Sequence, residues 1–318
     1  MNTKAVIDVG TNSIKLLVMR KNGGTGDVLS DRNDIVRLGE GVRMSGALSR
    51  EAMERAVSAI GGMAEEAVRL GADDVAVVGT QALRAASNTD DFIGSVRMRT
   101  GLTLEVIDGE TEADLSFLAA LSALEGGGAN CRALCMFDVG GGSSEIVAGD
   151  VSGGSFRCSL PAGALTLHDM FFRHVERAEE NRTAIARAEQ YMGSLLAEAG
   201  QANRKLVSKE GESGCCVGIG GTIATLASVM LALETFDAAS ISGAKLDLTE
   251  IERQIALFAR ALPEERSRIQ GLDAKRADII LAGACIVREM LVYFGFPSMM
   301  VSGRGLRYGV MMKRFGLC

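Results

Sequence analysis

Two stretches of the chain share one pattern of hydrophobic and polar positions. AVIDVGTNSIKLLV (residues 5–18) and CMFDVGGGSSEIVA (residues 135–148) each contain an apolar run that ends in an acid, then a glycine turn, then a second apolar run. Both turns carry hydroxyl or amide side chains. Apolar runs separated by a glycine turn predict the two strands of a hairpin. The chain is therefore predicted to form the same hairpin twice, about 130 positions apart.

In the other segments, the apolar positions recur with the spacing of a helix in some and with that of a strand in others. In the first half they predict a helix over 48–70 with Ser49 as N-cap and Gly71 as its end, a strand over 75–79, a helix over 80–86, a strand over 102–107 and a helix over 110–124. In the second half they predict helices near 164–175 and 181–199, a strand over 215–219, a helix over 249–262 with a capping box of Thr249 and Glu252, a helix over 277–294, a strand over 299–301 and a closing helix. Strands alternating with helices indicate α/β domains.

The length of the chain favours two domains. With 318 residues, of which 47% are hydrophobic, the chain is too long for one small core. The glycine-rich segment 125–130 (EGGGAN) predicts the boundary, so we expect an N-terminal domain over 1–127 and a C-terminal domain over 128–318. No apolar stretch reaches the ~18 residues of a membrane span. Because an acid follows at position 8, there is no room for the apolar core of a signal peptide, and we expect a cytoplasmic protein without membrane contact.

Charge and composition exclude several function classes. The net charge of −6 argues against a sequence-independent contact with nucleic acid, and the absence of Trp leaves few platforms for stacked bases. Seven Cys without paired spacing predict free thiols rather than a zinc site or a disulfide framework. The only two histidines, His168 and His174, do not share a helix face, so histidine-centred catalysis is poorly supported. A small or extended phosphate compound is the better candidate ligand.

The chemistry of the repeated turns fits phosphate. Glycine lets the backbone approach a ligand closely, so that N–H groups and neighbouring hydroxyls can donate to phosphate oxygens. The acids Asp8 and Asp138 beside the turns would repel phosphate unless a divalent cation lies between them, which suggests a metal-assisted site. Two ordinary tight turns with Asp caps are the alternative, which the repetition weakens. A third glycine turn, in GIGGTIATLA (218–227), follows a predicted strand and opens a helix, an arrangement that directs amides toward an anion.

The motifs taken in order resemble those of one family. DVGTNS, VGTQALRAASN, IDGETEADL, FDVGGGSSEIV, GIGGT, KRADIILAG and SGRGLRYG look like the successive motifs of the exopolyphosphatase and guanosine pentaphosphate phosphohydrolase family, from residue 8 to residue 309. The resemblance implies the superfold of actin, the sugar kinases and the heat-shock chaperone ATPases. We therefore expect an α/β protein with two actin-like (ribonuclease H-like) lobes, mixed sheets and an interlobe cleft. Since relatives often carry further C-terminal domains, the chain looks like the short, two-domain form.

The resemblance also implies a reaction and its residues. Water would attack a terminal phosphorus of inorganic polyphosphate or guanosine pentaphosphate, with Glu112 matching the general base and Arg84 the arginine that stabilises the transferring group. Asp138 and Glu145 match the acids that contact Mg²⁺ or Mn²⁺, and Asp8 would contribute through a metal-bound water. The implied phosphate-binding residues are Thr11, Asn12, Ser13, Gly140, Gly141, Gly142, Ser143, Ser144, Gly220, Gly221, Thr222, Arg276 and Arg307.

Several alternatives stay open at the level of the sequence. Glu112 lies in the first turn of a predicted helix, where a negative charge is favoured anyway, and Thr111 beside it stands where relatives often have another Glu. Arg276 and Arg307 could pair with acids such as Asp278. An ATP-dependent small-molecule kinase of the same superfold would need substrate motifs that the sequence lacks. A non-catalytic polyphosphate or alarmone sensor would not need the intact acids. The sequence leaves homodimer formation open.

Overall fold

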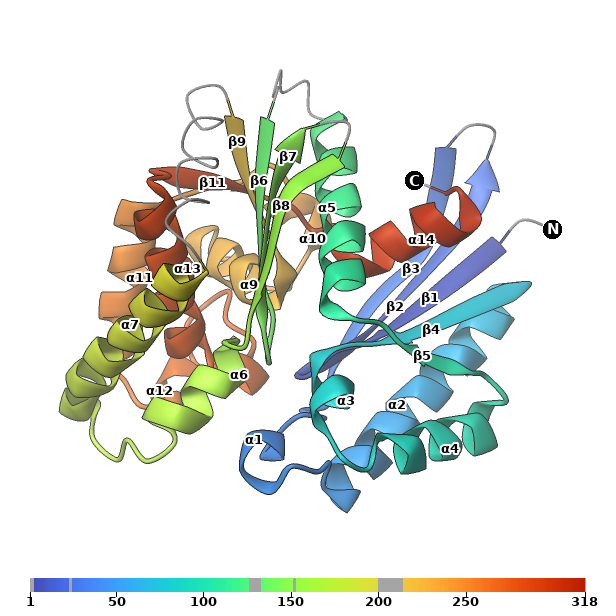
Figure 1. The fold of residues 1–318 in the computed structure, drawn as a ribbon, viewed down its shortest axis with the longest axis horizontal. Helices are drawn as coiled ribbons and strands as arrows, with labels where there is room; N and C mark the ends of the chain where they lie inside the picture. The colour runs from blue at the N-terminus through green and yellow to red at the C-terminus, as the bar shows by residue number, and fades with distance from the viewer. Residues whose placement is uncertain (1–2, 23–24, 126–132, 151–152, 200–213, 318) are drawn as a thin grey trace. The chain divides into compact units, whose positions relative to one another are not determined.

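The computed structural model describes residues 3–22, 25–125, 133–150, 153–199 and 214–317, which form two compact units (Figure 1). Unit 1 comprises residues 1–119 and 306–318, and unit 2 comprises residues 120–305. Each unit contains one mixed β-sheet, so the prediction of an α/β protein with two mixed sheets is confirmed.

The sheet of unit 1 has five strands in the order β3-β2-β1-β4-β5. They are β1 (Thr3–Val9), β2 (Ser13–Asn22), β3 (Thr25–Ile35), β4 (Asp74–Gly79) and β5 (Leu104–Val106). The first three strands form an antiparallel meander, whereas β1, β4 and β5 run parallel. Since parallel strands end at the same edge of a sheet, the segments after β1, β4 and β5 meet at one edge.

Helices cover both faces of this sheet. They are α1 (Val42–Ser45), α2 (Arg50–Arg69), α3 (Gln81–Ala85), α4 (Thr89–Thr100), α5 (Gly109–Glu125) and α14 (Leu306–Phe315). Helices α2 and α4 bury Ile60 and Phe92 against one face, and α5 and α14 bury Ala119 and Met311 against the other. The predicted N-cap of α2 is confirmed, because the Ser49 side chain accepts from the N–H of Ala52.

The sheet of unit 2 has six strands in the order β10-β11-β9-β6-β7-β8. They are β6 (Ala133–Val139), β7 (Ser144–Asp150), β8 (Gly153–Leu160), β9 (Gly214–Ile219), β10 (Lys245–Asp247) and β11 (Ser298–Val301). An antiparallel meander of β6, β7 and β8 again begins the unit, and β6, β9 and β11 run parallel. Unit 2 thus repeats the plan of unit 1.

The core of unit 2 surrounds α13 (Ile280–Phe294), whose apolar sequence is buried over most of its surface. The other helical segments are α6 (Ala164–Leu167), η1 (His168–Phe172), η2 (Ala178–Glu180), α7 (Asn181–Glu198), α9 (Gly220–Met230), α10 (Ala238–Ile241), α11 (Leu248–Ala259), α12 (Pro263–Arg266) and η3 (Ala274–Arg276). Phe294 of α13 packs 5.8 Å from Phe137 of β6, measured between ring centroids. None of the helices within the described ranges combines the length and the apolar character needed to cross a membrane.

The structure corrects the predicted domains and one helix start. Helix α14 belongs to unit 1 rather than to the predicted domain 128–318, because its apolar face packs against β1 and β2. The division near α5 falls at 119/120 instead of 127/128, and residues 126–130 of the predicted linker lie outside the described residues. Helix α11 is capped by Asp247, whose side chain accepts from the N–H of Glu250 at 2.8 Å, and not by Thr249.

The described cysteines follow the prediction with one exception. Among the described residues Cys135, Cys158, Cys216 and Cys285 are free, whereas Cys215 is disulfide-bonded. Burial raises the pKa of the Cys285 thiol to about 12.

Candidate active site

The two hairpins, β1–β2 and β6–β7, have the same turn. In the first turn the N–H of Gly10 donates to the carbonyl of Ser13 at 3.0 Å, and in the second the N–H of Gly140 donates to the carbonyl of Ser143 at 3.0 Å. A Cβ on either glycine would lie within about 3 Å of that same carbonyl oxygen, at 2.9 and 3.1 Å. Glycine therefore favours the close approach of the backbone in both copies, most strongly at Gly10.

The acids of the two hairpins have different partners across the strands. Asp8 lies opposite Lys15, whose Nζ donates to Asp8 Oδ2 at 3.4 Å. At the equivalent place in the second hairpin, Asp138 lies opposite Glu145. Directly opposed side chains of an antiparallel pair interact, and like charges there are destabilising unless something compensates them. The first hairpin thus carries a neutralised acid and the second carries two opposed acids.

Glu145 is deeply buried, with 1% of its surface exposed. The hydroxyl of Ser159 on β8 donates to Glu145 Oε1 at 3.0 Å. Burial, together with the Glu145 charge, raises the pKa of the neighbouring Cys158 thiol. A buried carboxylate is costly unless it is hydrogen-bonded or bound to a cation, and the hydrogen bond from Ser159 meets part of this requirement.

The third glycine turn lies beside Asp138 within unit 2. Gly220 has a φ of +93°, and a Cβ there would overlap the side chain of Asp138. Gly221 packs against the buried guanidinium of Arg276, since a Cβ at this glycine would lie 2.5 Å from Nη2. The predicted residues Asp138, Gly220, Gly221 and Arg276 are therefore neighbours. Thr222, at the first turn of α9, is buried.

The two predicted catalytic side chains meet in unit 1. Arg84 Nη1 donates to Glu112 Oε2 at 2.7 Å and to the carbonyl of Ile107 at 2.8 Å, and Nη2 donates to Gln81 Oε1 at 2.9 Å. Glu112 is 8% exposed. Arg84 comes from the short helix after β4 and Glu112 from the helix after β5, so both lie at the sheet edge where the β1–β2 turn also lies.

The start of α5 fixes the backbone of Glu112. The Asp108 side chain accepts from the N–H of Thr111 at 2.7 Å, and the Asp108 carbonyl accepts from the N–H of Glu112 at 3.0 Å. The hydrogen bond from the Thr111 backbone holds the pKa of Asp108 below its ordinary value, with a further contribution from the Thr111 side chain. Thr111 thus helps to cap the helix that carries the candidate base.

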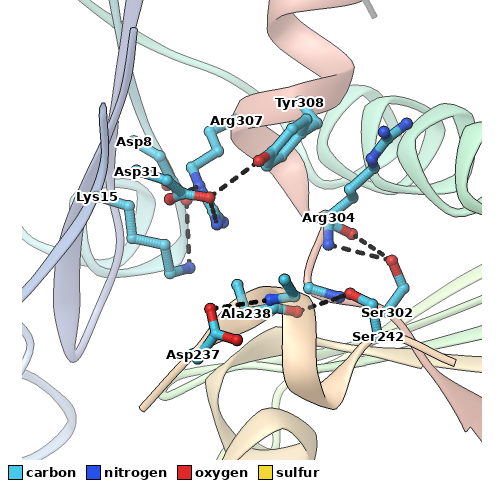
Figure 2. Close-up of polar contacts among 12 residues, drawn as sticks. Asp8, Lys15, Asp31, Asp237, Ala238, Ser242, Ser302, Arg304, Arg307 and Tyr308 are labelled. Carbon is cyan, nitrogen blue, oxygen red and sulfur yellow. Dashed lines mark hydrogen bonds and ion pairs between the residues drawn. The ribbon is translucent and has the colours of Figure 1, made fainter. Parts of the chain in front are cut away.

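Arg307 has a different environment from the one predicted. Its Nε and Nη2 donate to the two oxygens of Asp31 on β3, each at 2.8 Å, and the Tyr308 hydroxyl donates to Asp31 Oδ2 at 2.9 Å (Figure 2). Burial disfavours the charge on Arg307, but the carboxylate of Asp31 outweighs it and raises the pKa of the guanidinium. Two donors of Arg307 bind Asp31 rather than Asp278, so pairing with an acid, the alternative that the sequence left open, is present with another partner, and phosphate binding by Arg307 stays a prediction.

The predicted residues therefore form two sets. Unit 1 brings together the β1–β2 turn with Thr11, Asn12 and Ser13, the pair of Arg84 and Glu112, and Asp8 with Lys15. Unit 2 brings together the second turn with residues 140–144, the acids Asp138 and Glu145, and the third glycine turn with Arg276. Sequence reasoning missed Lys15, Asp31, Asp108 and Ser159. Of these, Lys15 could have been found, because it occupies the place of Glu145 in the aligned hairpins.

Comparisons with known proteins find relatives along nearly the whole chain. The chain is 28% identical to a bifunctional 3-dehydroquinate synthase/phosphatase of Fusobacterium nucleatum over 98% of its length and 46% of the relative. It is 29% identical to a guanosine-5'-triphosphate,3'-diphosphate pyrophosphatase of Photobacterium profundum over 97% of its length and 58% of the relative. The chain thus spans about half the length of these curated relatives.

Solved structures of similar length also match. The crystal structure of an exopolyphosphatase from Cytophaga hutchinsonii superimposes with a TM-score of 0.87 at 25% identity, covering 100% of this chain and 99% of that one. A model of the Ppx/GppA phosphatase family matches residues 17–316, which is nearly the whole chain. The chain belongs to the Ppx/GppA phosphatase family.

Proposed function

We propose that this protein hydrolyses terminal phosphoanhydride bonds, either releasing phosphate from inorganic polyphosphate or converting guanosine pentaphosphate to the tetraphosphate. The observation that carries the proposal is the ion pair of the buried Glu112 and the partly buried Arg84, at the sheet edge that also carries the β1–β2 turn. Membership of the family and the names of the similar proteins, a guanosine-5'-triphosphate,3'-diphosphate pyrophosphatase and an exopolyphosphatase, support the same reaction class.

In this proposal Glu112 accepts a proton from the attacking water. A carboxylate can act as a general base when it is held within hydrogen-bond reach of the water. The ion pair with Arg84 and the capped start of α5 hold it in one orientation. Arg84 has five N–H donors, and within the described ranges no acceptor binds its Nε, so this group can still donate to a phosphoryl oxygen.

We further propose that Asp138 and Glu145 hold Mg²⁺ or Mn²⁺. Two opposed carboxylates, one of them buried, provide the hard oxygen ligands that these ions prefer. Among the described residues no cluster of three or more His, Cys, Asp or Glu side chains is placed to bind a metal, which fits an ion completed by phosphate oxygens and water. When bound, the ion would neutralise charge on those oxygens. Asp8 is paired with Lys15, so it fits at most the indirect role through a metal-bound water.

The first test compares phosphate release by the parent and by Glu112→Gln. Substrates are short and long polyphosphate, guanosine pentaphosphate and ATP, each with Mg²⁺. Loss of a general base lowers kcat by roughly 10²- to 10⁴-fold, whereas the matched control Glu110→Gln, on an exposed position of the same helix turn, stays close to the parent. Competition between polyphosphate and guanosine pentaphosphate then identifies the preferred substrate.

Three results would contradict this proposal. Equal rates for Glu112→Gln and the parent would remove Glu112 from the role of base. Transfer of the ATP phosphate to a small acceptor rather than to water would identify a kinase, and tight binding without turnover across several metals would identify a sensor.

The second test concerns the metal. Chelation by EDTA is expected to abolish phosphate release, and added Mg²⁺ or Mn²⁺ is expected to restore it. Titration calorimetry with Mn²⁺ should give a Kd for Glu145→Gln that is about tenfold or more higher than the Kd for the parent. The exposed Glu179→Gln of the same unit serves as control. Unchanged Mn²⁺ affinity in Glu145→Gln would argue against this residue as a ligand.

Location and assembly also remain proposals. We keep the cytoplasm as the proposed location, which the free thiols of Cys135, Cys158, Cys216 and Cys285 support and the disulfide of Cys215 does not. Cell fractionation tests it. Light scattering on the purified protein tests the homodimer.

A further inference from the structure

Each candidate phosphate turn is hydrogen-bonded by the segment that follows the third strand of its own meander. In unit 1 this segment is 36–39. The N–H of Gly39 donates to the carbonyl of Thr11 at 2.9 Å. The N–H groups of Val36 and Arg37 both donate to the carbonyl of Asn12, at 3.0 and 2.9 Å. Arg37 has a φ of +54°, a left-handed conformation that a residue with a side chain adopts only at a cost.

In unit 2 the corresponding segment is 162–166. The N–H groups of Leu165 and Thr166 donate to the carbonyl of Gly141 at 2.9 and 3.1 Å. The Thr166 hydroxyl donates to the carbonyl of Gly142 at 3.0 Å. We call segments 36–39 and 162–166 the bracing segments.

Two of the carbonyls that the bracing segments bind are equivalent although the sequences of the segments differ, and unit 2 has one further bond, from the N–H of Ala164 to the carbonyl of Gly140 at 2.9 Å. When the two hairpins are aligned on Asp8 and Asp138, Thr11 corresponds to Gly141, and their carbonyls accept in both units. Asn12 corresponds to Gly142, and the same holds. The bracing segments read VRLG and AGALT, so this equivalence is not a repeat of sequence. In both units, therefore, the segment after the third strand hydrogen-bonds the same two carbonyl positions of the turn.

This hydrogen bonding orients the amides of each turn. The described chain contains no cis peptide bond, and in a trans peptide the C=O of one residue and the N–H of the next point in opposite directions. The carbonyls of Thr11, Gly141 and Gly142 point at the bracing segments. The N–H groups of the residues that follow them, Asn12, Gly142 and Ser143, therefore point away from the bracing segments. No described residue accepts from the N–H groups of Gly142 and Ser143. Successive amides that point the same way form an anion-binding concavity.

One glycine in each bracing segment makes the close approach possible. A Cβ at Gly39 would overlap Thr11 Cγ2 and lie 3.2 Å from the Cβ of Ala82. A Cβ at Gly163 would overlap the carbonyl of Gly141 and lie 2.6 Å from the nitrogen of Gly142. Gly163 has a φ of −119°, which any residue can adopt, so the short contact and not the backbone conformation requires glycine here.

We infer that Gly39 and Gly163 are positioning residues, which let the bracing segments hold the two turns with their amides directed at phosphate oxygens. The inference rests on the proposed function, because it names what aligns the phosphate-binding groups. It assigns a role to two glycines that contact no substrate themselves.

The experiment compares Gly39→Ala and Gly163→Ala with the matched controls Gly62→Ala and Gly193→Ala. Each control lies in a helix of the same unit, where a Cβ would meet no atom within 4 Å. Steady-state kinetics on polyphosphate and calorimetry with tripolyphosphate are measured for all four. We expect KM and the tripolyphosphate Kd to rise about tenfold or more in both bracing variants, since hydrogen bonds to a charged ligand are lost, and to stay within about twofold in the controls. A purely structural role would lower the melting temperature without changing the KM of the folded enzyme.

A rescue variant separates positioning from damage to the fold. Thr11→Ser removes the Cγ2 methyl that an alanine at position 39 would overlap, while it keeps the hydroxyl. The double variant of Gly39→Ala with Thr11→Ser should therefore recover the KM of Thr11→Ser alone. In unit 2, Thr166→Val removes one hydrogen bond to Gly142 without adding bulk, and should raise KM about threefold. These two variants test the inference even if Gly163→Ala fails to fold.

The possible results lead to distinct conclusions. If the parent binds and cleaves polyphosphate while Gly39→Ala and Gly163→Ala match their controls, the positioning role is wrong and the proposed function stands. The absence of rescue by Thr11→Ser would also reject the role of Gly39. If the parent neither binds nor cleaves any phosphate chain, the proposed function is wrong, and the inference is then wrong as well because it depends on that function.

Discussion

At the scale of single residues, the partner across the strand decides what each acid can do. Asp8 and Asp138 occupy the same place in two copies of one hairpin, yet Lys15 neutralises the first and Glu145 faces the second. The two copies of the hairpin therefore differ in the charge of the residue that faces the equivalent acid.

The pair of the buried Arg307 and the exposed residue Asp31 gives a stability prediction. Asp31→Asn removes the carboxylate that faces the buried guanidinium, so it should lower the free energy of unfolding by about 1–3 kcal/mol. Arg307→Lys keeps the charge but loses the two-pronged geometry, and should cost about 1–3 kcal/mol. Urea unfolding measures both. The exposed pair of Arg50 and Glu54 provides the control Arg50→Lys, with a change near zero. Equal effects of Arg307→Lys and Arg50→Lys would contradict an anchoring role.

The sequence predicted some of these residues and not others. Glu112 and Arg84 were found through the family motifs that contain them, and the structure brings them together. The role of Arg307 could not be read from its motif, because its partner Asp31 lies 276 positions earlier in the chain. Spacing along a sequence carries no information about a contact between segments so far apart.

At the scale of elements, the start of α5 couples a helix cap to the candidate base. Asp108 is exposed, and its pKa is lowered by the hydrogen bond from Thr111. A lowered pKa in the folded state means that the stabilisation is fully present above the ordinary pKa of a carboxyl group, about 4, and is lost as the pH falls through the lowered value. The charged form of Asp108 thus supports the helix at neutral pH.

Asp108→Ala should therefore lower the melting temperature at pH 7, and the difference from the parent should shrink as the pH falls below about 4. The same variant should reduce kcat, because the first turn of α5 carries Glu112. Thermal unfolding across pH and steady-state kinetics measure the two effects. Asp91→Ala, in the first turn of α4, is the control. A difference in melting temperature that persists unchanged at low pH would exclude the cap as its cause.

Element boundaries show where local patterns are ambiguous. Both Asp247 and Thr249 have an acid three residues later, so both match the start of a helix. The pairing of β10 with β11 extends to Asp247 and Ser298, which leaves Asp247 extended and lets the helix begin directly after it. Strand β3 was not predicted either, because the edge of the sheet allows a polar sequence (TGDVLSDRNDI) without alternating apolar positions.

At the scale of the whole molecule, the chain does not divide at one point. The last helix, α14, returns to unit 1 and packs on the first two strands (Figure 1). A Cβ at Gly309 would overlap the carbonyl of Leu115, so the backbones of α14 and α5 are in close contact. A composition-based boundary assumes that domains are continuous in sequence, and it cannot reveal a closing helix that completes the core of the first domain.

Met311→Ala tests this arrangement. Met311 is fully buried among Val6, Leu17 and Met19 of β1 and β2, so the cavity should cost about 2–5 kcal/mol. Amide hydrogen exchange should then show lost protection in residues 3–22, although they lie nearly 300 positions away in sequence. Protection in β6 and β9 of unit 2 should fall less. Met312→Ala, at a partly exposed position of the same helix, should leave both regions close to the parent. If Met311→Ala instead loosened β6 and β9 first, α14 would belong to the second domain, because a helix destabilises first the core that it completes.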